Sequence, residues 1–156
     1  MRLWVLLLLL CGAFTRSALA DGAEEYVRFK CEPKLGRASV ETLVVYDDPD
    51  ANNGEENKNG DIRLDSSMTD ETRKQRCRLG NDVMEIAIWY DPMRPRDNNV
   101  DASINGKRVT SLNFNPEQKS LFSVRRENKK LWVSVLNPPI FSRIGAEPKI
   151  KTWEWK

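Results

Sequence analysis

The sequence of 156 residues contains no histidine, and this absence excludes more chemistry than any other feature of its composition. Without imidazole there is no Ser/His or Cys/His catalytic pair, no histidine zinc ligand and no ordinary near-neutral proton switch. The chain also lacks a Ser-x-x-Lys spacing, a Gly-rich phosphate loop and a Gly-x-Ser-x-Gly elbow. Carboxylate pairs, a Ser/Lys dyad at another spacing and oxygen-bound metals are the catalytic arrangements that remain.

Long apolar runs are scarce, and the one at the N-terminus has the features of an export signal. Arg2 precedes the apolar residues 3–10, and Ala18 and Ala20 form a small-x-small cleavage site. The run is shorter than the roughly 20 apolar residues that cross a bilayer. We therefore expect residues 1–20 to be a signal peptide and residues 21–156 to be one exported domain, periplasmic or secreted, without a transmembrane span.

An excess of charge of one sign is also lacking. The chain has 25 Lys and Arg against 23 Asp and Glu, and the predicted signal peptide contains Arg2 and Arg16. The remaining domain therefore has 23 basic and 23 acidic side chains. Such a balance argues against a general nucleic-acid binder, which needs a basic surface.

Cysteine is rare, with three in the chain and two, Cys31 and Cys77, outside the predicted signal. Two thiols in an oxidising compartment most simply form one disulfide. Closing a loop of about 47 residues stabilises a fold by about 4 kcal/mol in the chain-entropy model. Their wide separation favours a structural bond over a redox pair, whose cysteines are usually close in sequence.

What the sequence does contain is strand-like alternation. In residues 26–31, Val27, Phe29 and Cys31 share one face, which predicts a half-buried strand with Cys31 pointing into the core. Residues 83–90 form the strongest such segment. Residues 67–75 are the one segment that predicts a helical turn, with Ser67 or Thr69 as the N-cap.

Turn signals join these segments into hairpins. Asn105 and Gly106 predict a two-residue hairpin turn, and the charged residues 126–130 predict the tip of a second hairpin. Counting gives seven or eight short strands. The expected fold is an all-β antiparallel β-sandwich with one disulfide, for which an immunoglobulin-like arrangement is one candidate.

The polar loop at residues 47–61 is the sharpest candidate for chemistry. Its alternating Asp48, Asp50 and Asn52, together with Asp61, offer the oxygen ligands that calcium takes. The spacing is not that of an EF-hand, because Gly54 stands at the seventh position from Asp48. Calcium is therefore the cofactor hypothesis, against a solvated loop whose residues serve turns and against a recognition loop.

Two tryptophans near the C-terminus form a second candidate. Trp153 and Trp155 share one face of a terminal alternating segment, with Lys151 in line. Their rings suggest a ligand platform for a sugar or a hydrophobic peptide, since indole combines an apolar face with an N–H donor. The alternative is an edge strand that packs its rings onto the core.

A further pattern is the Cys-Arg-Leu-Gly step at residues 77–80, which precedes a strand and the Asn-Gly hairpin at residues 105–106. This combination resembles a group of small exported bacterial proteins of unknown function. The resemblance implies bacterial export and a β-rich domain, and it implies no activity.

These observations give three functional hypotheses. The first is a non-enzymatic exported domain that contacts an envelope or extracellular protein or glycan through its loops, residues 47–61 and 91–99. The second is a secreted enzyme with a carboxylate site, or an enzyme inhibitor that inserts the rigid residues 137–140 into a partner's cleft. The third is a calcium-binding adhesion or stability module.

Overall fold

The structure is a computed structural model that describes residues 22–46, 56, 58–138 and 148–156. This part of the chain contains ten strands, one short α-helix and two 3-10 turns. In chain order they are β1 (Ala23–Glu32), η1 (Pro33–Leu35), β2 (Arg37–Tyr46), β3 (Ile62–Arg63), α1 (Asp70–Arg73), β4 (Lys74–Leu79), β5 (Asp82–Trp89), η2 (Pro95–Asp97), β6 (Asn99–Ile104), β7 (Lys107–Asn113), β8 (Ser120–Glu127), β9 (Lys130–Leu136) and β10 (Lys151–Trp155).

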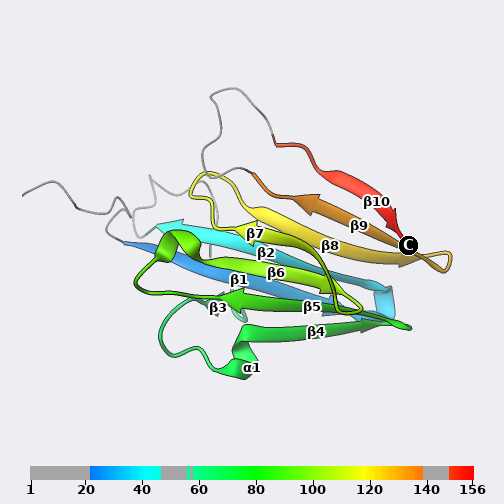
Figure 1. Ribbon diagram of the computed structural model, residues 1–156, viewed down its shortest axis with the longest axis horizontal. Coiled ribbons are helices and arrows are strands. Elements are labelled where there is room, and N and C mark those ends of the chain that lie inside the picture. Colours follow the sequence, from blue (N-terminus) through cyan, green and yellow to red (C-terminus); the bar gives the residue numbers. More distant parts are fainter. Residues whose placement is uncertain (1–21, 47–55, 57, 139–147) are drawn as a thin grey trace, which may run out of the picture.

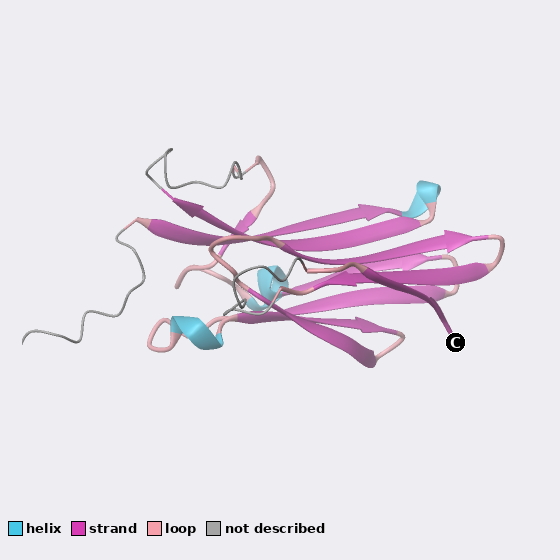
Figure 2. Ribbon diagram, turned by 90° about the horizontal axis from the view of Figure 1, so that it is seen from above, coloured by secondary structure: helices cyan, strands magenta, loops and turns pink. Residues whose placement is uncertain are grey.

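The strands form two antiparallel sheets. The larger sheet has the order β10-β9-β8-β2-β1-β3, and the smaller sheet is a meander of the consecutive strands β4-β5-β6-β7. Figure 1 shows the smaller sheet stacked on the part of the larger sheet that β8, β2 and β1 form, with β9 and β10 extending beyond β7. In both sheets the strands run along the long axis of the molecule (Figure 2).

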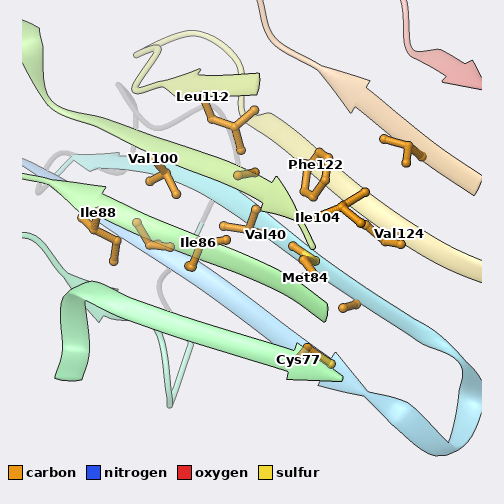
Figure 3. Close-up of a cluster of buried hydrophobic side chains, with 14 of the residues drawn as sticks. Val40, Cys77, Met84, Ile86, Ile88, Val100, Ile104, Leu112, Phe122 and Val124 are labelled. Carbon is orange, nitrogen blue, oxygen red and sulfur yellow. The ribbon is translucent and has the colours of Figure 1, made fainter. Parts of the chain in front are cut away.

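The core lies between the sheets and is built from alternating strand residues. Val40 and Phe122 of the larger sheet face Met84, Ile86 and Ile104 of the smaller one, and all five are at most 2% exposed (Figure 3). Burial of an aliphatic or aromatic side chain contributes about 1.5–3 kcal/mol. Side chains of this size from two facing sheets form one continuous core that stabilises the sandwich.

The predicted all-β antiparallel sandwich is confirmed, but the strand count and order need correction. The described residues form ten strands rather than seven or eight, and β4 lies in a segment that was not predicted to be a strand. The order also differs from an immunoglobulin domain, whose sheets contain strands A-B-E-D and C-F-G. Here four consecutive strands form one whole sheet.

The predicted disulfide is confirmed, and it joins the two sheets. Cys31 lies in β1 and Cys77 in β4, with Cα atoms 5.5 Å apart. Cys77 is 1% exposed. Cys31 is exposed, which corrects the expectation that it points into the core. It faces the other sheet, but it stands next to the last residue of β1, where core side chains no longer surround it.

The turns predicted from short sequence patterns are confirmed by the structure. Asn105 and Gly106, with φ values of 51° and 78°, connect β6 to β7 as the predicted two-residue hairpin turn requires. Asn128 and Lys129 also have positive φ values and connect β8 to β9. The predicted helical turn is α1, whose N-cap Thr69 accepts a hydrogen bond from a backbone N–H one turn later.

Candidate ligand pocket

A cavity of about 330 Å³ opens at the end of the sandwich where β1 begins and where β2, β5 and β7 end. This is the left-hand end in Figure 1, and the disulfide lies toward the opposite end. The volume falls within the roughly 300–1,000 Å³ range of small-molecule sites. The described lining includes three aromatic and three proline side chains: Tyr46, Tyr90, Phe114, Pro92, Pro95 and Pro116.

The pocket walls come from both sheets and from the connection between β5 and β6. Val44 and Tyr46 lie within the last three residues of β2, and Leu64 follows β3. Pro92 and Pro95 belong to the predicted contact loop at residues 91–99. Hydrogen bonds hold this loop, because the Asp91 carboxylate accepts from Met93 N at 2.9 Å and from Arg94 Nε at 3.0 Å.

Glu25 places a carboxyl group in this apolar wall. Its Oε2 atom accepts a hydrogen bond of 2.7 Å from Asn98 Nδ2, and Asn98 Oδ1 accepts one of 2.8 Å from Asp91 N. Because Glu25 belongs to β1 and Asn98 directly precedes β6, this contact joins the two sheets. Burial raises the pKa of Glu25 above its ordinary value, although the Asn98 hydrogen bond acts in the opposite direction.

The other charged groups of the lining neutralise each other. Arg63 of β3 forms an ion pair with Glu24 of β1, and Glu24 also accepts a hydrogen bond from the Tyr26 hydroxyl. Nearby, burial and the negative charge of Glu117 raise the pKa of Tyr46. The described lining therefore has three charged side chains, Glu24, Glu25 and Arg63, and carries one net negative charge when Glu25 is ionised.

Replacing Glu25 with glutamine is expected to stabilise the fold at pH 7. Glutamine keeps an acceptor for Asn98 but never carries the charge that burial disfavours. Because the folded pKa of Glu25 exceeds the value of 4.5 for the free group, the folded chain gains stability from its proton. This gain is complete below about pH 4.5 and is lost as the pH rises through the folded pKa. The difference in unfolding free energy between Glu25→Gln and the parent should therefore become smaller as the pH falls.

Urea unfolding of the parent and Glu25→Gln at pH 7 and pH 4 measures this difference. Glu32→Gln is the matched control, because Arg37 lowers the pKa of that exposed carboxyl. It should lose rather than gain stability at pH 7. Equal stability of the parent and Glu25→Gln at pH 7 would contradict the expectation.

Of the four proposed calcium ligands, the structure describes one. Asp48, Asp50 and Asn52 lie outside the described residues, as does the predicted signal peptide. Asp61 binds a cation of the protein itself: Arg28 Nε and Nη2 donate to its two carboxylate oxygens at 3.0 and 2.9 Å. Within the described ranges there is no group of three or more acidic or cysteine side chains placed to hold a metal ion.

Arg28 stands on the outer face of β1 and is buried there. Its guanidinium also contacts the Glu41 carboxylate at 3.3 Å and donates to the backbone oxygen of Glu56 at 2.9 Å. Asp61 in turn accepts a hydrogen bond of 2.7 Å from Lys58 N. The end of the predicted polar loop thus packs on the larger sheet around one arginine.

The two proposed platform tryptophans share a face of β10 but have different surroundings. They lie opposite Val133 and Leu131 of β9, which places both on the inner face of the larger sheet. Trp155 packs against the core, and Lys107 of β7 lies 5.4 Å from its ring centre. Trp153 is 36% exposed, because β10 extends beyond the smaller sheet. Of the two rings of the proposed platform, that of Trp155 therefore packs against the core.

The pocket itself was not predicted from sequence. Glu25 and Asn98 are 73 positions apart, and the walls come from separate segments. The one available signal was the proline-containing loop at residues 91–99, which was predicted as a contact region and contributes to the wall. No pattern in β1 distinguishes Glu25 from the adjacent Glu24.

Comparisons with protein-family models, curated proteins and solved structures found no match to this chain. No helix in the described ranges is long and apolar enough to cross a membrane.

Proposed function

We propose that this chain is an exported, non-enzymatic binding domain of the cell envelope or extracellular space, and that the pocket between Glu25, Asn98 and the aromatic wall holds its ligand. The observation that supports this proposal is a cavity of about 330 Å³ with three aromatic rings, three prolines and one half-buried carboxyl group, that of Glu25. Apolar walls with a few convergent polar groups are typical of small-molecule sites.

The pocket has the rigidity that binding requires. Its walls stand at strand ends, and proline rings fix the backbone of the adjoining loop. The Asp91 hydrogen bonds hold this loop without a ligand. A preformed pocket avoids the free-energy cost of ordering its walls when a ligand binds.

The assignment to an oxidising compartment agrees with the disulfide between β1 and β4. The N-terminal pattern of a basic residue, an apolar run and a small-x-small site supports export independently. A ligand of such a domain would be met outside the cytoplasm.

Titration with benzyl alcohol, a neutral one-ring probe, tests the pocket. We expect amide chemical-shift changes in an NMR spectrum to cluster at Leu64, Tyr90, Asn98 and Phe114. The variant Ala23→Phe adds a ring to the lining and should abolish them. Leu35→Phe, a change at an exposed site in η1, is the matched control and should bind like the parent. Shifts scattered over the surface, or unchanged by Ala23→Phe, would contradict the proposal.

A further inference from the structure

We propose that the pocket selects a small protonated amine with an apolar body, with Glu25 as the counter-ion of its ammonium group. This inference rests on the proposed function and specifies its ligand class. The cavity volume of about 330 Å³ suits a single ring with a short side chain better than a peptide segment.

The carboxyl group of Glu25 is positioned for such a role. Asn98 donates to Oε2 at 2.7 Å, and its own amide oxygen is fixed by Asp91 N at 2.8 Å. Among the described residues, Asn98 is the side-chain donor to this carboxyl group. Oε1 therefore retains its lone pairs for an N–H donor of a ligand, and charge-assisted hydrogen bonds are the stronger kind.

The surrounding charges favour a cation. Arg63 is engaged by Glu24, and Arg94 contacts Asp91 at 3.0 Å and Asp97 at 3.7 Å. Arg63, the one basic side chain of the described lining, is therefore already paired with a carboxylate, and so is Arg94 in the adjoining loop. With Glu24 and Arg63 neutralised, the charge that Glu25 adds is the net charge of the lining. A carboxylate or phosphate ligand would meet repulsion, whereas an ammonium group would complete the balance.

The aromatic wall supports the same ligand class. Tyr46, Tyr90 and Phe114 line one cavity with the carboxyl group, and the negative faces of aromatic rings attract cations. Pro92, Val44 and Leu64 supply apolar contacts for the body of the ligand. Burial raises the pKa of Glu25, because the partly desolvated carboxylate is disfavoured when it has no cationic partner. A bound ammonium group would offset that cost of desolvation.

The test compares three probes that share one ring: benzylammonium, benzyl alcohol and benzoate. Their dissociation constants are measured at pH 7 by NMR titration of the full domain. Benzylammonium is expected to bind about tenfold more tightly than benzyl alcohol, and benzoate most weakly. Glu25→Gln should remove the preference for the amine, so that this variant binds benzylammonium no more tightly than it binds benzyl alcohol. Glu32→Gln, which removes an equal charge elsewhere on β1, should keep the preference.

The outcomes separate the two proposals. If benzyl alcohol binds in the pocket as tightly as benzylammonium, the amine inference is overturned and the proposed binding site stands. Loss of the amine preference in Glu32→Gln to the same extent as in Glu25→Gln would also overturn it, because overall charge would then explain the selectivity. If none of the three probes perturbs the pocket, both proposals fall.

Discussion

Replacing Arg28 with alanine is expected to lower the unfolding free energy by about 3–5 kcal/mol. The guanidinium is 8% exposed and contacts Asp61, whose side chain is 4% exposed, and Glu41. Its removal would leave the carboxylates of Asp61 and Glu41 without their cation. Uncompensated buried charges are destabilising, whereas a surface ion pair contributes about 0–1 kcal/mol.

Urea denaturation followed by tryptophan fluorescence measures the loss. Arg37→Ala is the matched control, because Arg37 in the same sheet pairs with Glu32 at the surface. It should change the unfolding free energy far less than Arg28→Ala does, because solvent screens this exposed pair. Arg28→Lys keeps the charge but loses the two-pronged contact with Asp61, and should lie between the parent and Arg28→Ala. A loss for Arg28→Ala no larger than for Arg37→Ala would refute the structural role.

Loss of the disulfide is expected to have a comparable effect, about 4 kcal/mol in the chain-entropy model. The bond joins positions 46 residues apart and connects the two sheets, so its removal frees a large part of the unfolded chain. For a domain of this size the melting temperature should fall on the order of 10–20 °C. Thermal unfolding with and without dithiothreitol measures the shift.

Cys31→Ala is the better variant for this test, because Cys31 is exposed whereas a change at the buried Cys77 would also alter core packing. The variant should unfold like the reduced parent, and dithiothreitol should not change it further. A melting temperature of Cys31→Ala within a few degrees of the oxidised parent would show that sheet packing alone determines stability.

The sequence predicts the fold class because alternation and turns are local properties. Asn105 and Gly106 determine their hairpin with two residues, and the two cysteines had one simple pairing. The strand β4 was not predicted because Cys77 and Leu79 are its only two apolar inward residues, and because its first two residues fall in the segment that predicts a helical turn. Period-2 alternation also does not show what covers each face of a strand. The alternation therefore predicts the same surroundings for Trp153 and Trp155, whereas Trp155 packs against the core and Trp153 is partly exposed.

The pocket depends on long-range arrangement instead. Neither Glu25 nor Asn98 belongs to a motif, and each becomes significant only when the ends of β1 and β6 meet across the sandwich. The same holds for Asp61. Its place in the acidic loop indicated a metal ligand, whereas its partner Arg28 lies 33 positions earlier in the sequence and could not be recognised from spacing. Charged residues gain their roles from partners that alternation and spacing do not reveal.

The position of the smaller sheet within the chain has a consequence for folding. Strands β4 to β7 all lie between β2 and β8 in sequence, yet β2 and β8 are neighbours in the larger sheet. No tight turn can therefore align this pair, and loop-closure entropy makes it a slow contact to form. Val40 lies opposite Phe122, and both are fully buried. A slip by one residue would turn Phe122 toward solvent, so side-chain burial must select the alignment at this junction.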